Sequence, residues 1–525
     1  MRSSEDQLAN DDVQAAWTYH ERTKHSPASV RASGHRLDWD NQPRPYKLYR
    51  DVSAISLPGE RPVAPVSAFD VLLGGHTAGG RADQIDFPTL ATLLHYSTGI
   101  TKRLRYPGGV MDFRAASCTG ALYHIEVYLV CRDLPGLEAG VYQFGVHDAA
   151  LRRLRRGDLR GAVVDATASS REVAGAPVVL VFTSTYWRNA WKYQDRTYRH
   201  CFWDLGTILA NLFTMAAAHG VPASVHLGFV DAEVNRLIDV DGEGEAALAI
   251  VALGARGAST PPTPAVPSLH LDTVPLSPRE IDFPAIRAMH AAASLHSQAE
   301  VAAWRVAAER CFWPPTPAEA PGTAAQLPTL GQAELPGHSV EEVILRRGSA
   351  RSFREEPIRG DQLGTLLRCA AGEIPADVPF GLSHGWNTGY VIANAVDGLQ
   401  SGKYALESSA RALALLEAGD FRDHAGRLAL WQRLGADAAV DVYFLADLHR
   451  ALDCMGNRGY RAAQLEAAII AGRLYLAAYG LGLGATGLTF FDDAVVEFFG
   501  PHAEGKSVMF LIALGRPAVP PRRGP

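Results

Sequence analysis

Hydrophobic residues recur along the chain with two different periods. Leucines spaced three and four residues apart, which line one face of a helix, occur near residues 90 and 363. Runs rich in β-branched residues favour strands instead. The pattern predicts helices containing Leu90, Leu93 and Leu94, and Leu363, Leu366 and Leu367, and strands at Ile125–Val130 and Val178–Phe182.

Two longer apolar segments predict buried helices. One follows Tyr198 and the other follows Tyr460, and each continues for about five turns. The second is apolar on most sides, which is typical of a helix enclosed by the rest of a fold. Together with the strand-like runs, these segments predict an α+β protein in which a mixed sheet is wrapped by helices around a central helix.

The chain also repeats itself, at an offset of 262 residues that becomes 261 toward its end. Glycine, tyrosine, arginine and aspartate positions recur along with the apolar pattern. A repeat of this length indicates a duplicated domain of roughly 200 residues. The matched segments are 136–160 with 398–422, 176–184 with 438–446, 192–199 with 454–461, 228–234 with 489–495 and 250–254 with 511–515.

Proline-rich stretches at 255–283 and 312–338 separate the copies and are typical of linkers. The alanine-rich stretch between them, 284–310, predicts one helix with Pro284 in its first turn. The predicted division is an N-terminal extension (1–60), a first domain (61–256), a linker with one helix (257–338) and a second domain (339–525).

Composition excludes several classes of protein. A net charge of −6 does not favour a nucleic-acid partner. No apolar run reaches the roughly 18 residues of a membrane-spanning helix, and the polar N-terminus lacks a signal-peptide pattern. The six cysteines are scattered without a CxxC pair, which argues against a disulfide framework or a metal site and favours a reducing, cytoplasmic setting.

One glycine motif resembles a nucleotide site without its expected context. Residues 482–487 match GxGxxG, but a dinucleotide fingerprint follows a strand, whereas this stretch follows a predicted helix. It is therefore interpreted as a turn.

The second copy opens with SVEEVILRRGSARSF at 339–353. This stretch resembles the opening of the nitroreductase family, which implies a mainly antiparallel sheet and binding of flavin mononucleotide (FMN). Guanidinium groups match phosphate oxygens bidentately, and a serine hydroxyl adds a further hydrogen bond. The residues that the resemblance assigns to the FMN phosphate are Arg346, Arg347, Ser349 and Arg351.

The first copy resembles the azoline dehydrogenases of the SagB and McbC type, which oxidise thiazolines and oxazolines in modified peptides. The loop RAASCTGALYHIE at 114–126 and the stretch AWKYQDRTYR at 190–199 carry the resemblance, and segments 19–26 and 37–42 also match long members. The loop departs from the family pattern with Ser117-Cys118 in place of Pro-Ser and His124 in place of Pro. The resemblance implies catalytic roles for Lys192 and Tyr193, and contacts to the flavin from Ser117, Cys118, Gly120 and Leu122.

The two copies have lost opposite parts of such a site. The first has LGGHTAG at 73–79 where the second has LRRGSAR, and the second has Cys454-Met455 where the first has Lys192-Tyr193. The second also lacks a recognisable Ser-x-Gly-Ala-Leu loop. These complementary losses predict one composite FMN site in an intrachain pseudo-dimer; further pairing into a homodimer stays open. The resemblance adds Gly487, Leu488 and Thr489 near flavin N5, and Arg516 as another phosphate contact.

The resulting hypothesis is FMN-dependent oxidation of an azoline carried by a peptide or a carrier protein, with a cyclodehydratase or an assembly line as partner. A buried Lys192, its pKa lowered by desolvation, would act as base, and Tyr193 would share that role or orient the ring. Two alternatives stay open. One is another flavin enzyme that reduces nitro groups, quinones or dehydroamino acids with NAD(P)H, and the other is a non-catalytic scaffold.

Overall fold

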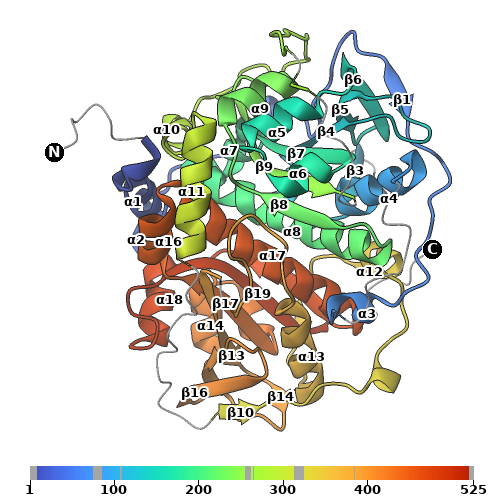
Figure 1. Ribbon diagram of the computed structural model, residues 1–525. Coiled ribbons are helices and arrows are strands. Elements are labelled where there is room, and N and C mark those ends of the chain that lie inside the picture. Colours follow the sequence, from blue (N-terminus) through green and yellow to red (C-terminus); the bar gives the residue numbers. More distant parts are fainter. Residues whose placement is uncertain are drawn as a thin grey trace.

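In a computed structural model, two large antiparallel sheets with helices between and around them make up most of the protein (Figure 1). The structure describes residues 9–74, 85–106, 109–254, 262–263, 265–311, 324–383 and 385–519. The helices are α1 (Gln14–Arg22), α2 (Pro27–Ala32), α3 (Ala68–Leu72), α4 (Phe87–Thr98), α5 (Arg160–Ala166), α6 (Arg171–Gly175), α7 (Tyr186–Tyr193), α8 (Thr197–Ala218), α9 (Asp231–Ile238), α10 (Pro284–Ala292), α11 (Gln298–Arg310), α12 (Val340–Arg346), α13 (Gly360–Ala370), α14 (Arg422–Leu428), α15 (Arg433–Asp437), α16 (Leu448–Met455), α17 (Arg458–Gly480) and α18 (Asp492–Phe499).

The two sheets have the same strand order, which confirms the predicted duplication. In the first half the order is β1 (Ala54–Ser56), β6 (Ala150–Arg156), β5 (Gly140–Gly145), β4 (Ile125–Cys131), β7 (Val178–Thr185), β9 (Glu245–Leu253) and β8 (Ala223–His226). In the second it is β10 (Ala324–Gln326), β16 (Ala412–Ala418), β15 (Gly402–Leu406), β13 (Asn387–Ala393), β17 (Val440–Ala446) and β19 (Ser507–Pro517), which pairs with both β11 (Phe353–Arg354) and β18 (Gly484–Leu488). Two small two-stranded sheets complete the list, β2 (Ile100–Tyr106) with β3 (Gly109–Arg114) and β12 (Ile358–Arg359) with β14 (Val396–Asp397).

The long helices α8 and α17 cross between the two sheets, as the apolar segments predicted (Figure 1). A methyl group on Gly206 of α8 would overlap Ala468 of α17, and one on Gly472 of α17 would overlap Ala210 of α8. These contacts are reciprocal, because the same offset of 262 relates Gly206 to Ala468 and Ala210 to Gly472. Glycine facing alanine lets the two backbones approach closely, so the two halves pack as an intrachain pseudo-dimer.

The segment from Tyr186 to Ala218, which comprises α7 and α8, is long and apolar enough to cross a membrane by length and composition. Its most apolar window is 94% buried inside the protein. The long helix of this segment, α8, is therefore the core helix of the first half.

Two buried clusters of arginine and aspartate join the halves reciprocally. Asp492, the first residue of α18, accepts hydrogen bonds from Arg199 (2.6 Å) and Arg196 (3.2 Å) of the first half. Burial alone would raise the pKa of Asp492, but the two arginines hold it below its ordinary value. Asp492 and its counterpart Asp231 in the second cluster are each the first residue of a helix, where the helix dipole favours negative charge.

The second cluster repeats the first by the pseudo-symmetry of the chain. Asp231 of the first half accepts hydrogen bonds from Arg458 (2.7 Å) and Arg461 (3.0 Å) of the second half. Its carboxylate also accepts the Leu295 N–H at 2.9 Å.

That last contact explains why residues 284–310 do not form the single helix predicted from their composition. Asp231 holds the backbone at Leu295, and the Ser297 side chain accepts the Glu300 N–H, which starts a new helix. The stretch is therefore split into α10 and α11.

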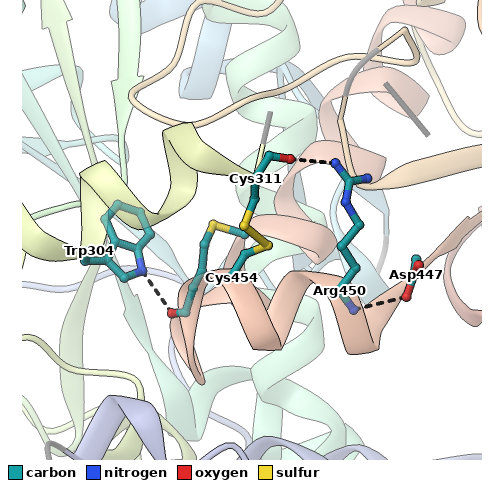
Figure 2. The surroundings of a disulfide bond; sticks show 6 residues. Trp304, Cys311, Asp447, Arg450 and Cys454 are labelled. Atoms are coloured by element: carbon teal, nitrogen blue, oxygen red, sulfur yellow. Dashed lines mark hydrogen bonds between the residues drawn. A yellow bond between two sulfur atoms is a disulfide. The ribbon is translucent and has the colours of Figure 1, made fainter. Parts of the chain in front are cut away.

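The cysteine pattern also gave a wrong expectation. Cys311, just after α11, and Cys454 of α16 form a disulfide with a Cα–Cα distance of 6.1 Å (Figure 2). They are 143 residues apart in sequence, so spacing alone could not pair them. Because disulfides are rare in reducing compartments, this bond removes the cysteine argument for a cytoplasmic setting.

The N-terminal extension, expected to be separate, packs along both halves. The Asn10 side chain donates to the Met455 carbonyl at 3.0 Å in the second half. Lys47 pairs with the buried Glu245 at 2.7 Å in the first half. The extension therefore helps to hold the two halves together.

We predict that Asp492→Ala destabilises the protein by about 3–5 kcal/mol, because Arg196 and Arg199 would remain buried without a counter-ion. Urea unfolding of the variant measures this loss. The matched control is Asp493→Ala at the next position, which removes an exposed ion pair with Lys24 and should cost at most about 1 kcal/mol. Equal effects of the two substitutions would contradict a structural role for the buried cluster.

Candidate functional site

Strand β7 leads into α7, whose last turn carries the predicted catalytic pair. The Lys192 ammonium lies 5.2 Å from the centre of the Tyr193 ring, and that ring meets His200 edge to face at 4.7 Å. Burial and the nearby Asp204 and Cys118 raise the pKa of Tyr193 well above its ordinary value. Lys192 is only half-buried, which corrects the expectation of a buried lysine.

The predicted flavin-facing loop lies against this pair. Gly120 has a φ of +63°, a left-handed conformation that favours glycine. A Cβ atom at Gly120 would lie 2.6 Å from the Tyr193 hydroxyl oxygen, so a larger residue would displace the tyrosine. The structure thus brings together two motifs that are about 70 residues apart in sequence.

A carboxylate that the sequence analysis missed holds the loop in place. Asp204, on α8, accepts hydrogen bonds from the Thr119 N–H at 2.8 Å and the Thr119 hydroxyl at 2.7 Å. Its other oxygen meets the Cys118 thiol and the His124 Nε2, both at 2.9 Å. The signal in the sequence was an acidic residue inside an apolar helix at the same repeat position in both copies, Asp204 and Glu466.

Two residues at which the loop departs from the family pattern, Cys118 and His124, contact Asp204. Desolvation and the Asp204 carboxylate raise the pKa of Cys118, so it stays a thiol that donates to Asp204. Its sulfur also accepts the Tyr123 N–H at 3.0 Å. On either side of it, the Ser117 carbonyl accepts from Thr207 at 2.8 Å, and Leu122 packs against the cluster of Trp187, Trp191 and Leu276.

The predicted phosphate-binding segment of the second half meets the same loop. Arg347 donates to the carbonyl oxygens of Ala115 at 2.8 Å and Arg114 at 3.1 Å. Arg346 and Ser349 are half-buried nearby in sequence, and Arg351 is exposed. Within the part of the chain that the structure describes, none of these three arginines forms an ion pair with a carboxylate. In the first half, most of the LGGHTAG segment, residues 75–79, lies outside the described residues.

The end of β18, also from the second half, reaches the site from the side of α8. Phe490 lies 5.7 Å from the ring centre of Trp203, which adjoins Asp204 on α8. Gly487 is exposed and Leu488 is buried. The Thr489 hydroxyl is buried and has no hydrogen-bond partner among the described residues.

The side-chain contacts of Arg516 are with residues that follow the predicted phosphate-binding segment. Its guanidinium donates to the Pro357 carbonyl at 2.8 Å and lies 4.0 Å from Glu356. Its contacts are thus with the 356–357 segment.

These side chains fit the phosphate and the ring of a flavin nucleotide. Guanidinium groups without a counter-ion suit a phosphate. At the end of β18, the unpartnered buried hydroxyl of Thr489 offers a hydrogen-bonding atom to a ring, and Gly487 nearby is exposed.

The sequence profile of the nitroreductase family matches residues 113–255 and 344–516, together more than half of the chain. The chain belongs to the nitroreductase family. Each match covers most of the sheet and the long helix of one half, so the family fold occurs twice.

Two proteins illustrate this similarity. The structure of an Anabaena variabilis protein that carries a nitroreductase assignment is similar over 96% of this chain and 99% of its own, with a TM-score of 0.73 and 26% identity. A Methanocaldococcus jannaschii protein with the same kind of assignment is 29% identical over 136 residues, which are 25% of this chain and 68% of that protein. The first match shows that the tandem arrangement is shared.

We predict that Asp204→Ala speeds hydrogen exchange at the Thr119 amide by about tenfold or more, because that amide loses its carboxylate acceptor. Mass spectrometry of peptides that cover residues 117–124 measures the change. Glu466→Ala is the matched control. It should leave the Thr119 amide unchanged and speed exchange at Gly381 and Trp386, whose amides bond to Glu466 at 2.7 and 2.9 Å. Unchanged exchange at Thr119 in Asp204→Ala would rule out the anchor.

Proposed function

We propose that this chain is an FMN-dependent azoline dehydrogenase with one composite site built from both halves. The observation that carries the proposal is the contact of Arg347, from the predicted phosphate segment, with the backbone of the predicted ring-facing loop at Ala115. Neither half alone offers both parts.

Family membership supports a flavin cofactor, and the proposal divides its binding between the halves. From the second half, Arg346, Arg347, Ser349 and Arg351 would hold the phosphate. The backbone at Gly487, Leu488 and Thr489 would face the ring from one side, and the Asp204-anchored loop would face it from the other. When bound, FMN would supply the acceptor for a hydride from Cβ of the azoline.

The residues of α7 would then handle the proton. The raised pKa of Tyr193 keeps its hydroxyl protonated near neutral pH, so it can donate a hydrogen bond but cannot serve as the base. We assign the role of base to the neutral form of Lys192, which would accept the Cα proton of the azoline. The cation formed on Lys192 would be stabilised by the face of the Tyr193 ring.

The resemblance of the loop and of the Lys192-Tyr193 stretch to azoline dehydrogenases supports the substrate class. The substrate would be an azoline on a peptide or a carrier protein, delivered by a cyclodehydratase or an assembly line, with oxygen as final electron acceptor. Since nitroreductases of other kinds share the fold, rapid reduction of the bound flavin by NAD(P)H, with no azoline turnover, would favour a reductase instead.

We predict that Lys192→Ala retains flavin but oxidises an azoline-containing peptide about 10²–10⁴-fold more slowly, because the general base is lost. Mass spectrometry follows the loss of two hydrogens from the peptide, and the visible spectrum reports the flavin. Lys24→Ala is the control for the loss of a lysine, since Lys24 forms ion pairs with Glu21 and Asp493 instead. Normal turnover by Lys192→Ala would refute the assigned role.

A second prediction concerns the residues proposed to bind the FMN phosphate. Arg346→Ala should weaken FMN binding by about 10- to 100-fold, because a hydrogen bond to a charged group contributes roughly 1.5–3 kcal/mol. Quenching of FMN fluorescence during titration gives the affinity. Arg354→Ala, which removes an exposed arginine paired with Glu356 in the same segment, should leave the affinity unchanged. Equal FMN affinities of the two variants would contradict the assignment of Arg346 to the phosphate.

A further inference from the structure

The pseudo-symmetry of the chain places a counterpart of the composite site on the opposite side of the α8–α17 pair. Its loop anchor is intact. Glu466, the counterpart of Asp204, accepts the N–H groups of Gly381 at 2.7 Å and of Trp386 and Asn387 at 2.9 Å. By the repeat offsets, His226, Leu227 and Gly228 correspond to Gly487, Leu488 and Thr489, and Cys454 and Met455 correspond to Lys192 and Tyr193.

An indole ring fills the space between these counterparts. Trp304 of α11 is 5% exposed, and its ring packs on Gly228, where a Cβ atom would lie only 2.9 Å from it. On its other side, the Trp304 N–H donates to the Met455 carbonyl at 2.9 Å (Figure 2). The tryptophan thus lies between the counterpart of the β18 end and the counterpart of the catalytic pair, where the composite site would hold the flavin ring.

Next to Trp304, a carboxylate accepts hydrogen bonds from the backbone N–H groups of the β18-end counterpart. Asp377 accepts the N–H groups of Leu227 at 2.9 Å and Gly228 at 2.8 Å. Its own backbone is fixed, because the Asp377 N–H donates to the Val225 carbonyl at 3.0 Å. On the composite side, the residue at the position of Gly228 is Thr489, whose buried hydroxyl has no hydrogen-bond partner among the described residues.

A disulfide connects α11, the helix that carries Trp304, to α16 of the second half. Cys454, the counterpart of Lys192, is bonded to Cys311 at the end of the helix that carries Trp304 (Figure 2). Arg450 of α16 donates to the Cys311 carbonyl at 2.8 Å. Cys454 occupies the position of the proposed base Lys192, and its disulfide attaches the end of α11 to α16.

We infer that this counterpart is a second ring-binding site filled from within, in which Trp304 and Asp377 take the places of a planar heterocycle and of its hydrogen-bond acceptor. Emptying it by removal of the indole would open this position to a planar aromatic heterocycle. The inference rests on the proposed function, because the proposed FMN site defines where the ring lies. On this inference, the native chain would hold a single flavin.

Titration with lumiflavin, a flavin ring without a phosphate chain, tests the inference. FMN-saturated wild-type protein and Trp304→Phe, which keeps an aromatic ring in place, should quench no lumiflavin fluorescence. Trp304→Gly should bind about one further equivalent. A folded Trp304→Gly that binds no lumiflavin would overturn the inference.

The count of FMN on the wild-type chain provides the second test, which holds even if Trp304→Gly fails to fold. One FMN per chain supports the inference, and two would overturn it while leaving the proposed cofactor intact. No FMN at all would instead refute the proposed function, and the lumiflavin comparison of Trp304→Gly with Trp304→Phe would still decide whether Trp304 fills a ring site.

Discussion

The reciprocal arginine–aspartate clusters fix the relation on which the rest of the structure depends. Each places two guanidinium groups of one half around one carboxylate of the other, with all three side chains buried. Separating the halves would leave these charges unpaired in an apolar surface, so the clusters are satisfied in only one docked arrangement. That arrangement brings Arg347 to the loop of the first half and Phe490 to Trp203 on α8. The proposed composite site would therefore form only when the two halves are docked.

Within this symmetric frame the two sides have diverged at a few positions. Both keep an acidic residue on the long helix that anchors a loop, Asp204 on one side and Glu466 on the other. One side has Lys192 and Tyr193 beside that loop, and the other has a disulfide-bonded Cys454 and a tryptophan from the linker. The linker helices are thus part of the fold of the second side rather than a spacer between domains.

Sequence patterns predicted the elements well because periodicity and repeat offsets are local or regular signals. The helices at Leu90 and Leu363, the strands at 125 and 178 and the duplication are all confirmed. Such signals do not predict which distant segments come into contact. The partners of Asp231, the pairing of Cys311 with Cys454 and the break before α11 depend on which surfaces meet after folding. For the candidate site, motifs pointed to the loop and to the Lys192-Tyr193 pair, which the structure brings into contact. Asp204 showed only as a repeated acidic position, and the hydrogen bond of Arg516 to Pro357 had no signal in the sequence.

The most direct test of the composite site is an experimental structure of the chain crystallised with FMN. The account predicts one flavin, with its phosphate against Arg346 and Arg347 of the second half and its ring between the end of β18 and the Tyr193–Gly120 contact of the first half. Density for a flavin bound entirely within one half, or at the Trp304 position, would contradict it.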